Sequence, residues 1–80
     1  MQVEVRLYAT LLRYLPDLKA GQAQQLALPE GATVAGLLAA LGVPDGGDLH
    51  AFVNDVSVEH DWVLNEGDRV GVFPQLGGGR

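Results

Sequence analysis

Residues 29–42 read PEGATVAGLLAALG and combine a turn, a helix start and a helix stop. Pro29-Glu30-Gly31 is typical of a turn. Thr33 is a predicted N-cap, and Gly42, with Pro44 beyond it, is where a helix is expected to end. Between them the apolar residues recur at the spacing of one helix face, at Val34, Leu37, Leu38 and Leu41. The stretch therefore predicts the main helix of the chain, with one face packed into a core.

Before this helix, two runs alternate between polar and apolar residues, which is the period of a half-buried strand. Residues 2–8 form the clearer run, with Val3, Val5 and Leu7 on one face. Residues 24–28 form the second, with Leu26 and Leu28 inward.

Between the two runs, Thr10 is expected to cap a short helix whose Leu11, Leu12 and Leu15 lie on one side. Pro16 and Gly21 are expected to end this helix in a loop.

After the main helix, the pattern predicts three further strands. Residues 50–53 and 56–58 are expected to pair around a tight turn at Asn54-Asp55. Residues 65–68 form a second strong turn before a last strand over residues 69–73. A long helix across one face of a mixed sheet is the simplest way for so short a chain to cover apolar strands, with the last strand central beside the first. The predicted fold class is α+β.

Composition limits the chemistry that the chain can perform. With 80 residues, 48% of them apolar and 19% charged, the chain suits one small folded domain. It has no cysteine, which removes disulfides, thiolate metal sites and a cysteine nucleophile. His50 and His60 have no third metal ligand at a suitable spacing, and Ser57 and Thr10 have no visible catalytic partners. We expect no catalytic residues, no bound metal and no bound cofactor.

The formal net charge of −5 is unevenly distributed, because residues 43–68 contain acidic residues and no Lys or Arg. The acidic residues are Asp45, Asp48, Asp55, Glu59, Asp61, Glu66 and Asp68. This distribution argues against nucleic acid as a partner, and it serves either solubility or the steering of a basic protein. No apolar run reaches the roughly 18 residues that span a bilayer, and residues 1–6 do not resemble a signal peptide. We expect a cytoplasmic protein with no membrane partner.

The chain finishes with VFPQLGGGR, residues 72–80. Three consecutive glycines, Gly77, Gly78 and Gly79, resist a fixed structure, and they lack the following helix of a phosphate-binding loop. Fully extended, residues 75–80 reach about 20 Å without a bulky side chain at the three glycines. We therefore expect a folded domain over residues 1–74 and a flexible, extended glycine tail over residues 75–80 that can thread a narrow tunnel.

Motifs along nearly the whole chain carry a family resemblance. They are Val3-Glu4-Val5-Arg6-Leu7-Tyr8-Ala9, Leu28-Pro29-Glu30-Gly31-Ala32-Thr33-Val34, Val53-Asn54-Asp55, Asn65-Glu66-Gly67-Asp68-Arg69-Val70, Phe73-Pro74 and the glycines of the tail. In this order the chain resembles the MoaD/ThiS family of ubiquitin-like sulfur carriers, closest to the small subunit of molybdopterin synthase. The resemblance implies a β-grasp fold, in which a mixed sheet packs on one main helix.

The resemblance also implies a mechanism. An E1-like enzyme uses ATP to adenylate the carboxylate of the last glycine, here Gly79, and a sulfur donor converts it to a thiocarboxylate. The tail then delivers sulfur in the active site of a partner, such as the molybdopterin synthase large subunit. In this chain Arg80 follows Gly79, so either a C-terminal peptidase removes Arg80, or the chain does not carry sulfur in the usual way, or Arg80 was added in cloning.

Several alternatives stay open at this stage. The chain is a sulfur carrier, a ubiquitin-like protein modifier or a docking module. A sulfur carrier can serve molybdenum or tungsten pterin cofactors, thiamine or cysteine synthesis, and Phe73, Pro74 and Leu76 favour the pterin route. Phe73 is predicted either to contact a partner, with Pro74 and Leu76, or to fill a gap under a loop. Trp62 is interpreted as a partly buried packing residue.

Overall fold

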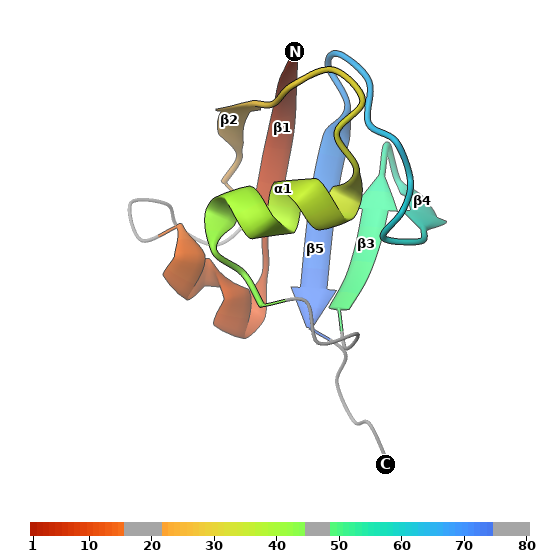
Figure 1. The fold of residues 1–80 in the computed structure, drawn as a ribbon. Helices are drawn as coiled ribbons and strands as arrows, with labels where there is room; N and C mark the ends of the chain where they lie inside the picture. The colour runs from red at the N-terminus through yellow and green to blue at the C-terminus, as the bar shows by residue number, and fades with distance from the viewer. Residues whose placement is uncertain (16–21, 45–48, 75–80) are drawn as a thin grey trace.

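The computed structural model describes residues 1–15, 22–44 and 49–74. Five strands, one α-helix and one 3₁₀ helix follow one another along the chain (Figure 1). They are β1 (Gln2–Leu7), η1 (Ala9–Tyr14), β2 (Gln24–Ala27), α1 (Val34–Leu41), β3 (Leu49–Val53), β4 (Val56–Val58) and β5 (Arg69–Pro74). This is the order of elements that the sequence predicts.

The strands form one mixed sheet in the order β2-β1-β5-β3-β4. The last strand, β5, lies in the middle as predicted: it runs parallel to β1 and antiparallel to β3. The parallel register places Val5 beside Val70 and Leu7 beside Val72. Residues from the two ends of the chain therefore share the centre of the sheet.

The helix α1 crosses one face of the sheet, in front of β1, β5 and β3 (Figure 1). The strand residues on that face are fully or almost fully buried, because successive side chains of a strand alternate between its two faces. The buried residues of the sheet and of α1 are Val3, Val5, Leu7, Ala51, Val53, Val70, Val72, Val34, Leu37 and Leu38. The core therefore lies between the sheet and α1, and within the described ranges no helix covers the opposite face of the sheet.

Both ends of α1 are formed by the residues that the sequence indicates. The Thr33 hydroxyl accepts a hydrogen bond from the Gly36 N–H at 3.1 Å, which satisfies one donor of the first helical turn. At the other end Gly42 has a φ of 77°, and its N–H donates to the carbonyl of Ala39. Glycine adopts this left-handed conformation without the steric cost that a side chain would bring. The predicted cap and stop are confirmed.

The short helix η1 departs from the prediction. It is a 3₁₀ helix that begins at Ala9, and the flanking Tyr8 supplies no side-chain cap. Thr10 therefore lies inside the helix and is not its cap, so that prediction is wrong. After β1 ends at Leu7, the chain turns at Ala9, whose φ is 55°, and η1 begins at this residue, one before Thr10. Leu11 and Leu15 are buried in the core, as expected, whereas Leu12, predicted on the same side, is only half-buried.

Two tight turns lie at the end of the sheet where β5 begins. Asn54 and Asp55, with φ values of 52° and 71°, join β3 to β4, as expected for a two-residue hairpin turn. Before β5, the Asp68 carboxylate accepts from the Asn65 N–H at 2.8 Å, and the Asn54 side chain donates to Asp68 at 3.0 Å. Both predicted turns are present, and they are hydrogen-bonded to each other.

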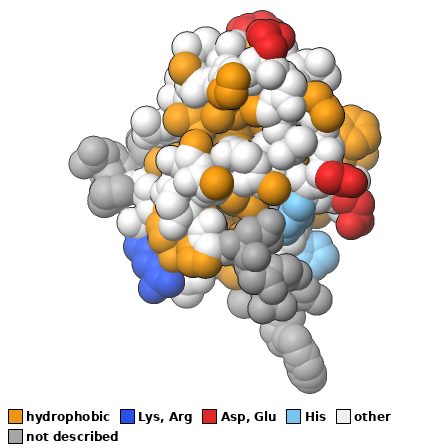
Figure 2. Space-filling view, viewed as in Figure 1, with side chains coloured by type: hydrophobic (Ala, Val, Ile, Leu, Met, Phe, Trp, Pro, Cys, Tyr) orange, Lys and Arg blue, Asp and Glu red, His pale blue; other side chains and the backbone are white. Residues whose placement is uncertain are grey.

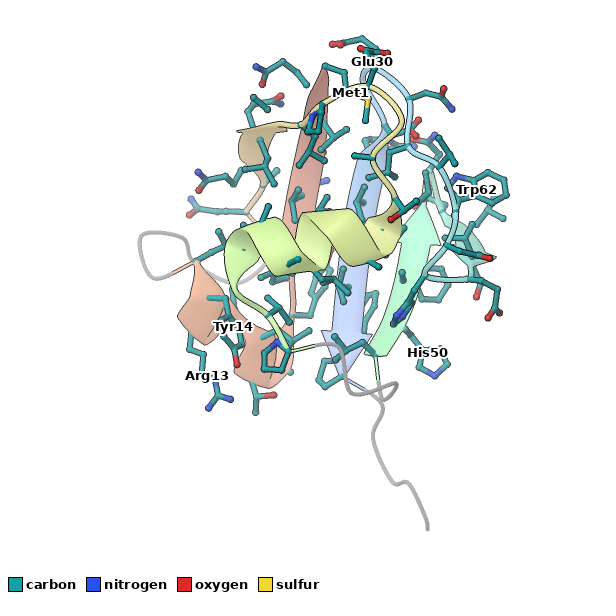
Figure 3. All side chains as sticks on the ribbon, in the orientation of Figure 1. Met1, Arg13, Tyr14, Glu30, His50 and Trp62 are labelled. Carbon is teal, nitrogen blue, oxygen red and sulfur yellow. The ribbon has the colours of Figure 1, made fainter. Side chains whose placement is uncertain are left out.

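The loop between β4 and β5 passes along the N-terminal end of α1. The N–H of Val34 donates to the carbonyl of Trp62, and the N–H of Ala35 donates to that of His60. Leu64 is buried, whereas Trp62 is 48% exposed, which is more than the predicted packing role implies (Figure 3).

No helix within the described ranges is long and apolar enough to cross a lipid bilayer.

Candidate functional site

Most of the predicted site residues follow the last residue that the structure describes. Strand β5 ends at Pro74, which pairs with Leu49 and is half-buried. Leu76, Gly77, Gly78, Gly79 and Arg80 lie outside the described residues, as does the predicted tail over residues 75–80. The structure does describe Phe73 and Pro74 and the surface of the sheet around Phe73, and this surface is the candidate site.

That surface is the face of the sheet opposite α1, which we call the outer face. It is defined by the side chains of Arg6, Tyr8, His50, Phe52, Arg69 and Phe73. In β5, Val70 and Val72 point to α1, so Phe73 points to the outer face, where its side chain is 38% exposed. This is the orientation that the alternation of β5 predicts.

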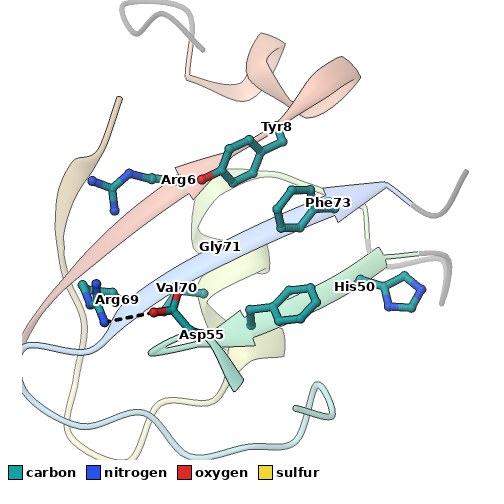
Figure 4. A pocket seen from close by; sticks show the side chains of 9 residues that line it. Arg6, Tyr8, His50, Asp55, Arg69, Val70, Gly71 and Phe73 are labelled. Carbon is teal, nitrogen blue, oxygen red and sulfur yellow. Dashed lines mark hydrogen bonds and ion pairs between the residues drawn. The ribbon is translucent and has the colours of Figure 1, made fainter. Parts of the chain in front are cut away.

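Phe73 belongs to a cluster of three aromatic rings. The Tyr8 and Phe73 rings stack in parallel, with centroids 4.2 Å apart and planes 2° apart (Figure 4). The edge-to-face partner of Phe73 is Phe52, at 5.6 Å. Each such aromatic pair contributes about 0.5–1.5 kcal/mol beyond simple burial. The cluster therefore holds Phe73 in one position, immediately before Pro74.

The register of the sheet explains how this cluster forms. The three rings come from the end of β1, from β5 and from β3, which are neighbours in the sheet. The N–H of Tyr8 donates to the carbonyl of Val72 at 3.2 Å, which places Tyr8 beside Phe73. Gly71 has no side chain, and a Cβ there would lie 3.6 Å from the Tyr8 ring. The Tyr8 ring thus lies over the backbone of β5 at Gly71.

Charged side chains flank the aromatic cluster. Arg6 forms an ion pair with Glu4, and the Arg69 guanidinium lies 3.4 Å from the Asp55 carboxylate (Figure 4). Both pairs are partly or largely exposed to water, so each contributes little to stability. Arginines at the rim of an aromatic patch can exchange such partners for carboxylates of a binding protein.

The outer face is hollowed between these side chains. An open hollow of about 500 Å³ is lined by the aromatic rings, both arginines, Asp55 and His50. An exposed aromatic centre with a charged rim is the usual anatomy of a protein docking surface. The arrangement suits binding of a protein partner.

The histidines do not form a metal site in the part of the chain that the structure describes. His50 lines the hollow on the outer face, whereas His60 Nε2 donates to the carbonyl of Leu49 at 2.9 Å. Within the described ranges, no three histidine or carboxylate side chains gather closely enough to hold a metal ion.

Comparison with known proteins establishes the family. The family model described as the ThiS family matches residues 6–79, which is nearly the whole chain. The chain belongs to the ThiS family. The resemblance to ubiquitin-like sulfur carriers is therefore confirmed. No curated protein sequence matches the chain.

Solved structures share its fold. The chain is similar to molybdopterin converting factor subunit 1 of Pyrococcus furiosus, with 26% identity over 95% of this chain and 99% of that one and a TM-score of 0.73. The small archaeal modifier protein SAMP1 of Haloferax volcanii is 22% identical over 99% and 100% of the two chains, also with a TM-score of 0.73. The predicted α+β, β-grasp fold is confirmed.

A third similar structure contains a protein complex. It is the complex of subunits 1 and 2 of the molybdopterin-converting factor of Helicobacter pylori. The match has 21% identity and a TM-score of 0.61, and it covers 99% of this chain and 100% of that chain.

The sequence interpretation identified Phe73 as a partner-binding residue but missed the other five residues of the outer face. Arg6 and Tyr8 alternate with the buried residues of β1, so their position on the outer face follows from the strand pattern. The contact of Tyr8 with Phe73 depends on the pairing of β1 with β5, which the sequence predicts, and also on the register of that pairing, which the strand pattern does not give. Phe52 and Arg69 were missed for the same reason.

Proposed function

We propose that this chain is a sulfur carrier that works through the carboxylate of Gly79 after Arg80 has been removed. An E1-like enzyme uses ATP to form an acyl adenylate at Gly79 with release of pyrophosphate. Hydrosulfide from a sulfur donor then displaces AMP at the acyl carbon, and the resulting thiocarboxylate donates its sulfur in molybdopterin synthesis. The chain is a cosubstrate in this scheme, and the partner enzymes supply the catalytic groups.

The observation that carries the proposal is the extent of the family match. It runs from residue 6 to residue 79, so it includes the glycines of the predicted tail and excludes only Arg80 at the C-terminal end. Adenylation of Gly79 requires a free carboxylate, whereas in the present chain that carbonyl is part of a peptide bond to Arg80. A peptidase that removes Arg80 supplies the missing step.

The tail sequence is suited to this chemistry. Glycine carries no side chain, so Gly77, Gly78 and Gly79 allow the acyl carbon to enter a closed active site. Once it is held there, the partner enzyme orients the attacking group and stabilises the charge that develops on the acyl oxygen.

The outer face supports the docking step. Its aromatic cluster includes Phe73, the residue before Pro74. A partner that binds Phe73 therefore lies at a fixed position relative to the start of the predicted tail. Arg6 and Arg69 flank the cluster, and carboxylates on the partner complement them. We propose that Phe73, with Pro74 and Leu76, contacts both the E1-like enzyme and the sulfur-accepting enzyme.

The molybdopterin pathway is supported by the nature of the similar structures. Two of them are molybdopterin converting factor subunits, and the Helicobacter pylori subunit 1 is held in a complex with subunit 2. By analogy, the acceptor of this chain is the large subunit of a molybdopterin synthase.

A reconstitution experiment tests the proposal. The chain ending at Gly79 and the chain ending at Arg80 are each incubated with the E1-like enzyme of the same cells and ATP, and pyrophosphate release is measured. We expect release only with the chain that ends at Gly79. Equal release with both chains, or none with either, would contradict the proposed role of Gly79.

A second function is favoured by one comparison. The similar SAMP1 structure is that of a small archaeal modifier protein, so conjugation of Gly79 to lysines of other proteins is the alternative. It needs the same free carboxylate, and it is distinguished by its product. Covalent adducts of this chain on cellular proteins, detected by mass spectrometry, would establish modification, whereas a thiocarboxylate at Gly79 would establish sulfur transfer.

A further inference from the structure

A second surface of the molecule carries exposed apolar side chains. Within the described ranges, the large apolar residues that are exposed are Val56, Trp62, Val63 and Phe73. Phe73 belongs to the outer face. Trp62 and Val63 lie in the loop after β4, with exposed fractions of 48% and 52%. We call the surface of Glu59, Asp61, Trp62 and Val63 the Trp62 edge.

The backbone of the Trp62 edge is held firmly in place. The backbone N–H of Trp62 donates to the carbonyl of Glu59 at 3.0 Å, and the backbone carbonyl of Trp62 accepts from the N–H of Val34 at 3.1 Å. Val63 forms a bridge with Thr33, and the adjoining Leu64 is buried with its N–H bonded to the carbonyl of Ala32 at 2.8 Å. The exposed indole therefore projects from a fixed segment, so a partner would pay little entropy to order it.

The charge of the Trp62 edge is entirely negative. Glu59 and Asp61 are exposed, and neither carboxylate has a hydrogen-bond or ion-pair partner in the part of the chain that the structure describes. No Lys or Arg occurs between residues 43 and 68. Figure 2 shows acidic and hydrophobic side chains next to each other on the right of the molecule, the side on which Figure 3 places Trp62. Unpaired carboxylates beside an exposed indole complement a cation with an apolar stem.

The Trp62 edge is separate from the outer face. The carbonyls of His60 and Trp62 accept from the N–H groups of Ala35 and Val34, so this loop runs along the α1 side of the sheet. Figure 3 places Trp62 beyond β3, away from the end of β5. The two surfaces also differ in charge, since both arginines of the hollow lie on the outer face.

We propose that the Trp62 edge binds an arginine-rich segment of a protein partner. A guanidinium lies over the indole of Trp62, neighbouring guanidinium groups pair with Asp61 and Glu59, and an apolar side chain of the segment covers Val63. Arginine fits better than lysine, because its planar group stacks on an aromatic ring and also donates two parallel hydrogen bonds to a carboxylate. This binding does not involve Gly79, and it leaves the outer face open to a second protein.

The experiment uses the chain itself as its reporter. Trp62 is the only tryptophan, so selective excitation of indole fluorescence reports on this surface alone. The probe is a synthetic peptide of alternating arginine and leucine, and its control is the same peptide with neutral citrulline in place of arginine. We expect a saturable change in Trp62 emission with the arginine peptide, weakened by added salt, and none with the citrulline peptide.

Matched variants separate a local site from general attraction to an acidic protein. Asp61→Asn and Glu30→Gln each remove one negative charge, and Glu30 is exposed and lies away from Trp62 (Figure 3). We expect Asp61→Asn to raise the dissociation constant about threefold and Glu30→Gln to leave it unchanged. Trp62→Ala, measured by calorimetry because it removes the reporter, is expected to raise it about tenfold.

Four results would overturn the proposal. They are an emission that does not change, an equal response to the citrulline peptide, equal losses from Asp61→Asn and Glu30→Gln, or a peptide affinity that survives Trp62→Ala. An emission that shifts with protein concentration in the absence of peptide would instead assign the surface to a second copy of the chain. Because the peptide titration needs no activating enzyme, its failure is distinguishable from failure of the sulfur-carrier proposal.

Discussion

The two faces of β5 differ in almost every physical respect, although their residues alternate along one strand. Val70 and Val72 on the α1 side are buried among aliphatic side chains. On the outer face, Phe73 is partly exposed in an aromatic cluster, and Arg69 is largely exposed beside Asp55. The α1 side removes apolar area from water, whereas the outer face keeps aromatic area available.

We therefore expect stability and recognition to depend on opposite faces of the same six-residue strand, β5. A change on the α1 side should reduce the free energy of unfolding without altering how folded molecules bind. A change on the outer face should alter binding and leave most of the stability intact. The following predictions test whether the separation holds.

The largest expected effect is on the α1 side. Leu37→Ala removes a fully buried side chain and leaves a cavity, so we expect the free energy of unfolding to fall by about 3 kcal/mol in urea denaturation. At a temperature where the variant is still folded, its affinity for the E1-like enzyme should equal that of the parent. A large loss of affinity in the folded variant would mean that the α1 side also contributes to binding.

The next effect is on the outer face. Phe73→Ala removes the ring that contacts both Tyr8 and Phe52, and it should weaken binding to the E1-like enzyme about 30-fold if Phe73 is a docking anchor. The free energy of unfolding should fall by only about 1 kcal/mol. Surface plasmon resonance and urea denaturation measure the two quantities. Unchanged binding would mean that Phe73 serves only the fold.

A smaller effect concerns the start of α1. Thr33→Ala removes the hydroxyl that accepts from Gly36, and we expect a loss of about 1 kcal/mol in thermal or urea unfolding. Thr10→Ala is the matched control, because Thr10 caps no helix in this structure and its replacement should change stability by less than about 0.5 kcal/mol. Equal losses from the two substitutions would show that capping does not explain the effect.

The smallest effect is expected at the charged rim. Asp55→Asn removes the ion-pair partner of Arg69, but this pair is largely exposed, so the free energy of unfolding should change by less than about 0.5 kcal/mol. Asparagine also tolerates the positive φ of this turn position. A loss above 1 kcal/mol would mean that the rim, like the α1 side, contributes to folding.

The parts of the fold that local chemistry determines were predictable from the sequence. The helix between Thr33 and Gly42 carries its own cap, its own apolar face and its own stop, and the structure confirms all three. The alternation of apolar residues in β5 likewise predicts Phe73 on the outer face, where the structure has it.

The parts that depend on the register between distant strands were not predictable in the same way. The sequence predicts β5 beside β1, but the contact of Tyr8 with Phe73 also depends on how these two strands, from opposite ends of the chain, are aligned. The predicted cap at Thr10 is wrong because η1 already begins at Ala9, which has a positive φ that neither propensity nor spacing indicates. The exposure of Trp62 follows from bonds between its loop and α1, which are also long-range.

The most direct test of the central claim is the intact mass of the protein isolated from its own cells without a C-terminal tag. The account predicts a chain that ends at Gly79, with part of the population carrying sulfur in place of one carboxylate oxygen. A population that always retains Arg80, in cells where the E1-like enzyme is active, would contradict the sulfur-carrier mechanism.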